Sequence, residues 1–221
     1  MITVSQLVEE GVNQSPYLRE AITDDLVNLS ALARKLQPQI EKRLYKKVTE
    51  GSILIALQRY ANALEPYYQV NPAKYLANLT VRSDLFEMTV VNSPVLLDKL
   101  SQVANSRDKS FSSVFVFTQG SNETTIITNK SIQHELEKAL FDEQISQIIP
   151  DLTGIALQRT HGQIETTGVL QFPLRILAWE GISVIEIITT INEIMVTVRD
   201  FEVDRAISSI RQALKSVSEQ K

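Results

Sequence analysis

The sequence contains no cysteine among its 221 residues. A disulfide scaffold, a thiolate metal site and a cysteine nucleophile are therefore excluded. No apolar run approaches the ~20 residues that a membrane-spanning helix needs. The N-terminus, MITVSQLVEEG, lacks the basic segment and small-residue cleavage site of a secretory signal. Together these absences predict a cytoplasmic protein with no membrane partner.

Histidine and glycine are also scarce, with two histidines and seven glycines in the chain. Neither His134 nor His161 belongs to a metal-binding pattern such as His-x-x-x-His or Glu-x-x-His. The sequence has no Gly-rich loop of either common phosphate-binding type, and no nucleophile–base pair stands out. The single tryptophan, Trp179, follows an apolar stripe and is expected in the core. We therefore predict a non-catalytic protein without a metal or cofactor.

The net charge of −4 averages two unlike parts of the chain. Up to Arg82 there are ten Lys and Arg residues against eight Asp and Glu, whereas the remainder has twelve against eighteen. Most of the positive charge lies in one segment, where Glu41 is the only acid among Arg34, Lys35, Lys42, Arg43, Lys46 and Lys47. Such an asymmetry indicates different roles for the two parts.

Residues 1–65 carry the capping signals and apolar period of helices. Thr3 begins a capping box, Ser15 precedes a proline at a first helical position, and Thr49 starts a segment with an apolar stripe. Gly11 is expected to end the first helix, and Pro38 to divide the segment that Ser30 caps. Residues 66–82 hold two prolines and three tyrosines without a sustained period, which predicts a linker.

From about Thr80 the pattern changes to strands and helices, and their order occurs twice. Residues 83–150 predict strand, helix, two strands in a hairpin around Gly120, and helix; residues 151–221 repeat that order. This is most of the ferredoxin-like βαββαβ plan. The segment QISQII can close the first repeat, whereas the last strand of the second repeat is missing or borrowed. The predicted fold class is α+β, with a helical head followed by two ferredoxin-like domains.

The second repeat resembles an ACT domain, and most closely those of the regulatory part of aspartate kinases. The resemblance rests on the loop ETTGVL at residues 165–170, the turn EGISVIEI from Glu180, Glu193 at a strand start, and Arg205-Ala206 in the last helix. The family usually has proline at the position of Thr167 and asparagine at that of Ser183. The first repeat matches by pattern alone. The kinase domain has no counterpart, so the resemblance implies a regulatory module without kinase activity.

The resemblance also implies a site for a small effector, usually an amino acid, at a junction of two ACT domains whose strands pair in a homodimer. The residues support such a site, because the loop leads to a helix N-terminus that favours a carboxylate and Gly168 permits close approach. The alternative is that Gly168 only allows the turn and takes no part in binding. The predicted ligand-binding residues are His161, Glu165, Thr166, Thr167, Gly168, Val169, Leu170, Ile182 and Ser183. The matching positions in the first repeat, around Asn92 and Ser113, form a weaker site.

The helical head has two interpretations. In a helix-turn-helix or winged-helix domain, the last helix would read DNA bases through Ser52, Gln58 and Arg59, and the six basic residues above would contact phosphates. In a plain helical bundle, the same residues form a solvated face. Three functional hypotheses follow: a metabolite-binding regulatory protein, a ligand-responsive DNA-binding regulator, and a free-standing regulatory subunit of a biosynthetic enzyme such as aspartate kinase.

Overall fold

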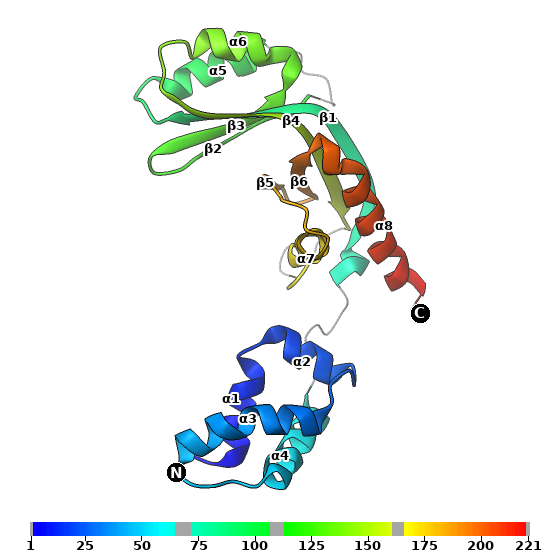
Figure 1. Cartoon of the computed structure of the whole chain (residues 1–221). Helices are drawn as coiled ribbons and strands as arrows, with labels where there is room; N and C mark the ends of the chain where they lie inside the picture. Colours follow the sequence, from blue (N-terminus) through cyan, green and yellow to red (C-terminus); the bar gives the residue numbers. More distant parts are fainter. Residues whose placement is uncertain (1, 65–71, 107–112, 161–165, 220–221) are drawn as a thin grey trace. The chain divides into compact units, whose positions relative to one another are not determined.

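A computed structural model describes residues 2–64, 72–106, 113–160 and 166–219. The chain divides into two compact units, Met1–Val70 and Asn71–Lys221, which we call the N-terminal unit and the C-terminal unit (Figure 1). Each unit has a hydrophobic core of its own. Over the described ranges, none of the helices combines the length and apolar character required to cross a bilayer.

Four helices form the described part of the N-terminal unit. They are α1 (Val4–Asn13), α2 (Pro16–Thr23), α3 (Leu29–Leu44) and α4 (Glu50–Ala63). Each begins at a polar side chain that accepts a backbone N–H of the first turn, namely Thr3, Ser15, Asn28 and Thr49. The predicted caps at Thr3, Ser15 and Thr49 are confirmed, whereas Asn28 replaces Ser30 as the cap of α3.

The prediction that Gly11 ends the first helix is wrong. The helix continues to Asn13, because Val8 and Val12 on one face are fully buried in the core. A Cβ atom on Gly11 would lie 3.0 Å from the Cδ2 atom of Leu36 on α3. The glycine therefore allows two helices to pack closely and does not act as a stop signal.

Pro38 lies inside α3 and does not divide it, so this prediction was wrong. Leu36 and Ile40, on either side of the proline, are both buried in the core. The side-chain amide of Gln37 also donates to the backbone carbonyl of Val48, with 2.7 Å between the atoms. Tertiary packing on both sides thus outweighs the helical hydrogen bond that proline removes.

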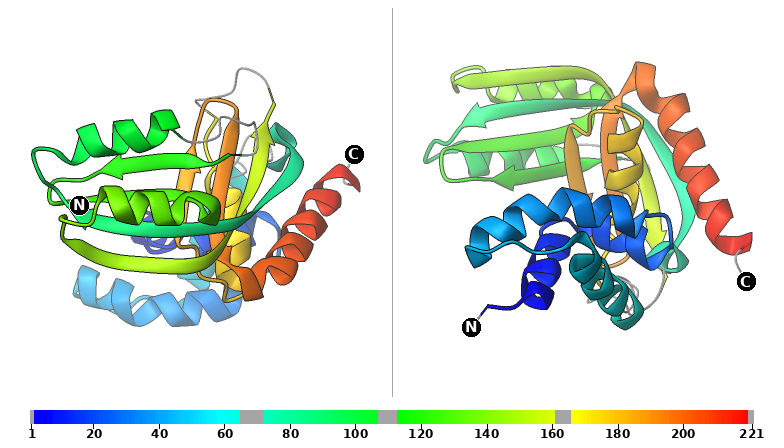
Figure 2. Two further views of the ribbon diagram at one scale, coloured as in Figure 1. Left: turned by 90° about the horizontal axis from the view of Figure 1, so that it is seen from above. Right: turned by 60° about the horizontal axis from the view of Figure 1, so that its bottom comes forward.

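A six-stranded antiparallel sheet, ordered β2-β3-β1-β4-β6-β5, organises the C-terminal unit (Figures 1 and 2). Its strands are β1 (Leu76–Val91), β2 (Phe115–Gln119), β3 (Glu123–Asn129), β4 (Ile145–Arg159), β5 (Glu186–Thr189) and β6 (Glu193–Arg199). The helices are α5 (Leu96–Ser106), α6 (Gln133–Ala139), α7 (Gln171–Trp179) and α8 (Val203–Glu219), with short 3-10 turns η1 (Pro72–Tyr75), η2 (Lys130–Ile132) and η3 (Asp200–Glu202).

The long strands β1 and β4 run through both halves of this sheet. Residues 85–91 of β1 pair with β3 on one side and with the first part of β4 on the other. Residues 76–82 of β1 pair with the last part of β4, which β6 flanks on its other side. Figure 1 shows both strands passing from the half that carries α5 and α6 to the half that carries α7 and α8. Each half therefore contains four strands, ordered as in a ferredoxin-like unit.

The course of β1 and β4 through both halves locates the strand that the second repeat lacked. Its closing strand is residues 76–82, which precede the whole first repeat and which the sequence had assigned to the linker 66–82. The segment QISQII closes the first half as expected, since β4 begins at Ile145 and pairs with β1. Each repeat is thus completed by a strand that is continuous with the first strand of the other repeat.

The two long strands bend at a shared irregular point. Leu85 pairs with Leu152, and the register shifts on either side of Leu85. Each leucine follows an aspartate in the left-handed region, with φ of 57° at Asp84 and 59° at Asp151. Aspartate adopts this conformation more readily than most residues, and such bulges increase the local twist of a strand.

Three cores hold the C-terminal unit together. One lies under α5 and α6, and a second lies under α7 and α8. The third occupies the opposite face of the sheet, because side chains alternate along β1 between Phe86 and Met88 on the helical side and Leu85 on the other. We call this third core the inter-half cluster, and its buried members are Leu85, Val114, Ile127, Ile149, Leu152, Ala156 and Met195.

Candidate functional site

The predicted ligand-binding residues lie at the two ends of α7. His161 and Glu165 fall outside the described residues. Residues 166–170 lead into the first turn of α7, whereas Ile182 and Ser183 follow its last turn. Because α7 has 9 residues, it is about 14 Å long. The structure therefore does not bring Ser183 close to the loop that precedes α7 within one chain.

The corner before α7 is a glycine turn that leads into the helix. Gly168 has a φ of 84°, a conformation that favours glycine. Its carbonyl accepts the N–H of Phe172, 3.0 Å away, and this hydrogen bond leads into the first turn of α7. Leu170 is the N-cap and supplies no side-chain cap, in contrast to the residues that begin α1 to α4. The N-cap residue itself therefore provides no side-chain oxygen at the positive end of the helix dipole.

Two of the predicted site residues belong to the core. Val169 and Ile182 are 3% and 4% exposed, respectively, and both pack in the cluster under α7 and α8. Thr167 and Leu170 are exposed, and Thr166 and Gly168 are half-buried. The buried Val169 anchors the corner while its neighbours stay accessible at the start of α7.

The end of α7 is closed by its own backbone. Gly181 has a φ of 67° and its N–H donates to the carbonyl of Ala178, while the N–H of Ile182 donates to Leu177 at 2.9 Å. This is a glycine C-cap, so Gly181 acts as a turn glycine. Ser183 follows it and is exposed.

At the equivalent corner of the first half, Asn92 forms side-chain hydrogen bonds with the β2–β3 hairpin. The side-chain amide of Asn92 donates to the Gly120 carbonyl at 2.9 Å, and its oxygen accepts the hydroxyl of Thr124 at 2.7 Å. At the same end of the half, Lys99 pairs with Asp142 and Glu143. Hydrogen bonds from the Lys99 ammonium hold the pKa of each of these two carboxyls below its usual range. Asn92 therefore ties the connection before α5 to the β2–β3 hairpin.

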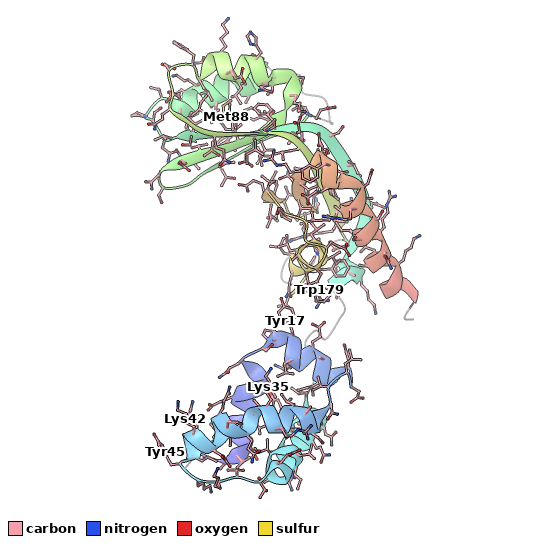
Figure 3. All side chains as sticks on the ribbon, in the orientation of Figure 1. Tyr17, Lys35, Lys42, Tyr45, Met88 and Trp179 are labelled. Carbon is pink, nitrogen blue, oxygen red and sulfur yellow. The ribbon has the colours of Figure 1, made fainter. Side chains whose placement is uncertain are left out.

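Half of the predicted basic cluster in the N-terminal unit is paired with carboxylates. Arg34 pairs with Glu50, Arg43 with Glu10 and Lys47 with Glu41, at 3.0, 3.4 and 3.4 Å. The cluster thus faces three acids, not Glu41 alone. Lys35, Lys42 and Lys46 are exposed and form no ion pair within the described residues. Figure 3 labels Lys35 and Lys42 on α3. Exposed pairs of this kind contribute about 0–1 kcal/mol and exchange readily.

The turn between α3 and α4 is fixed by Glu41. Its carboxylate accepts the backbone N–H of Val48 at 3.0 Å, and this hydrogen bond, supported by Lys47, lowers the pKa of Glu41. Tyr45, at the C-cap of α3, is left-handed and 95% exposed. The outward face of α4 carries the predicted residues Ser52, Gln58 and Arg59 together with Ile55 and Asn62, all of them exposed.

Two other candidates have ordinary surroundings. His134 is exposed on α6, and the described residues include no group of three potential metal ligands. Trp179 was expected in the core, but it lies at the last position of α7 and is 70% exposed. The guanidinium carbon of Arg175 lies 5.1 Å from the centre of its ring, in a cation–π contact.

Comparisons with known proteins identify the fold. No family model and no curated protein matches the sequence. The ligand-free regulatory subunit of aspartate kinase from Thermus thermophilus matches with a TM-score of 0.53 and 16% identity, over 62% of this chain and 98% of that chain. The regulatory subunit from Thermus flavus matches with a TM-score of 0.52 and 15% identity, over 63% and 98%.

The whole aspartate kinase from Clostridium acetobutylicum gives a TM-score of 0.54 at 13% identity, over 67% of this chain but only 37% of that chain. The match therefore leaves most of the complete enzyme uncovered, whereas it covers nearly all of the separate regulatory subunits. At such low identities the likeness concerns the fold alone. Over about three fifths of its length, the chain has the fold of the regulatory subunits of aspartate kinase.

Proposed function

We propose that the C-terminal unit is a non-catalytic regulatory module of two ACT domains that binds a small metabolite, an amino acid, at the corner formed by residues 166–170. The observation that carries the proposal is the left-handed Gly168 two residues before the N-cap Leu170, whose apolar side chain cannot cap α7. A carboxylate placed there gains the backbone donors and the dipole of α7. The fold shared with aspartate kinase regulatory subunits supports the same assignment.

A second copy of the chain is part of this proposal. Ser183 is separated from Gly168 by the length of α7, so both cannot contact one small ligand from the same chain. If Ser183 contributes its hydroxyl, it does so from a neighbouring ACT domain. Ligand at such a junction would favour one relative arrangement of the two domains, which is the physical basis of an allosteric response.

Binding can be tested by calorimetry and thermal melting of the whole chain with each of the twenty L-amino acids. We expect heat with one or a few of them, and a stabilisation of about 2.7 kcal/mol at a hundredfold excess over Kd. Ser183→Ala should weaken binding about tenfold by removing one hydrogen bond. The matched control is Ser208→Ala, an exposed serine on α8, which should bind as the unmodified chain does. An absence of heat with every amino acid would contradict the proposal.

A second candidate function, DNA binding by the N-terminal unit, has a separate basis. The exposed row on α4 contains side chains that can bond base edges, and Lys35, Lys42 and Lys46 remain available for phosphates. The three carboxylates paired with the other basic residues oppose it, which makes it the weaker proposal.

The DNA proposal makes a salt-dependent prediction. Each phosphate contact adds about 0.9 to the slope of log affinity against log salt, so Lys42→Ala with Lys46→Ala should lower that slope by about 2. Arg211→Ala with Lys215→Ala removes the same charge from exposed positions of α8 and serves as the control. Equal retention of all three proteins on duplex DNA, at every salt concentration, would rule out the proposed contacts.

A further inference from the structure

Glu87 is a carboxyl group buried in the sheet where an apolar residue would be expected. It lies on β1, on the face of the inter-half cluster, and is 6% exposed. Its partners across the sheet are Ile127 on β3 and Ile149 on β4, both members of that cluster. Its Oε2 atom is inaccessible to solvent and has no hydrogen-bond partner among the described residues. A charged carboxylate in such a place is strongly disfavoured.

The charged groups that act on Glu87 come from the other half of the sheet. They are Glu186 on β5, which repels a negative charge, and Arg199 on β6, which attracts it. The Arg199 guanidinium also donates to the carbonyl of Pro150 at 3.0 Å, so its charge is shared with β4. The backbone N–H of Glu186 is fixed by the hydroxyl of Thr197 at 2.9 Å. Ionisation of Glu87 thus places repulsion across the contact between the halves.

These surroundings determine the protonation of Glu87. Burial, and to a smaller extent repulsion by Glu186, raise the pKa of its carboxyl from 4.5 to about 7, while Arg199 partly opposes the shift. Between pH 4.5 and about pH 7, the folded chain therefore keeps a proton on Glu87 that the unfolded chain has released. Folding stability from this group is complete below pH 4.5 and is lost as pH rises through about 7.

We propose that Glu87 is a proton-dependent latch between the two halves of the sheet. With its carboxyl neutral, the inter-half cluster stays packed. When the proton leaves, Glu87 and Glu186 repel each other and the contact between β1 and the β5–β6 hairpin loosens. The latch does not depend on metabolite binding, because it lies on the face of the sheet opposite α7. It makes the packing of the two halves sensitive to pH near neutrality.

The stability test uses the whole chain and three variants. From pH 6 to pH 8.5 the unfolding equilibrium constant of the unmodified chain should rise about tenfold through Glu87, on a pKa change from 4.5 to about 7. Glu87→Gln keeps the shape of the neutral form and should abolish this rise. Glu186→Gln should reduce it by removing the repelling charge. Glu180→Gln, at an exposed position, is the control and should leave it unchanged.

The latch itself can be observed through the methionine methyl groups. Met195 belongs to the inter-half cluster, whereas Met88 lies in the core under α5 and α6. In carbon-13 methyl NMR spectra of the unmodified chain, the Met195 signal should move with a midpoint near pH 7. In Glu87→Gln the signal should not move, and in Glu186→Gln it should move at a lower pH. A Met195 signal that titrates identically in all the proteins, or that does not titrate in the unmodified chain, would overturn the proposal.

Discussion

Removal of residues 1–82 will unfold the second half of the sheet, although every residue of the second sequence repeat is retained. The deletion takes away the strand segment 76–82, which pairs with the last part of β4. It also removes Ala73 and Leu76, which are buried in the core under α7 and α8. A fully buried apolar side chain contributes about 1.5–3 kcal/mol, and a domain is stable by only about 5–15 kcal/mol.

The matched fragment for this experiment begins at residue 72 and keeps η1 and all of β1. Circular dichroism and thermal melting should show a cooperative transition for residues 72–221. The fragment 83–221 should melt at a much lower temperature or lack a cooperative transition. Equal melting of both fragments would mean that residues 76–82 are not part of the folded sheet.

Gly154→Val should destabilise the C-terminal unit through crowding in the inter-half cluster. A Cβ atom at Gly154 would lie 2.7 Å from the sulfur of Met195 and 3.3 Å from the Cδ1 atom of Leu85. The branched side chain must therefore displace both neighbours, and overpacking of this kind costs about 1–3 kcal/mol. Denaturant unfolding of the whole chain measures the loss.

A double variant separates crowding from other causes. Met195→Ala alone should destabilise by about 2–5 kcal/mol because it leaves a cavity. Combined with Gly154→Val, it should cost less than the sum of the single changes, since the valine fills space that the methionine vacated. Strict additivity would show that the crowding predicted at Gly154 is absent.

Local signals made much of the fold predictable. The caps at Thr3, Ser15 and Thr49 depend on residues three apart, so they can be recognised without knowledge of the fold. The hairpin around Gly120 and the strands of the second repeat follow from short apolar runs rich in β-branched residues and bounded by turn signals. These features depend on neighbouring residues and therefore survive in a single sequence.

Features that depend on distant partners could not be predicted. Residues 76–82 are a strand because the last part of β4 lies beside them, and the prolines and tyrosines just before them suggested a connection. Pro38 is tolerated because α3 is held by contacts with the core and the following turn. Glu87 looks like an ordinary polar residue of an alternating strand until the second half of the sheet covers it.

The candidate site was only partly predictable for the same reason. Gly168 and the start of α7 follow from a local pattern, and the structure keeps them together. The predicted helix already separated Gly168 from Ser183, but nothing in the sequence showed that Asn92 would tie the matching corner of the first half to the β2–β3 hairpin.

Amide hydrogen exchange of the whole chain, with and without a mixture of the twenty L-amino acids, tests the proposed binding corner most directly. Our account predicts slower exchange for the amides of residues 168–172 in the presence of the mixture, and no change at the start of α5. Unchanged exchange at residues 168–172, or equal protection at the start of both helices, would contradict it.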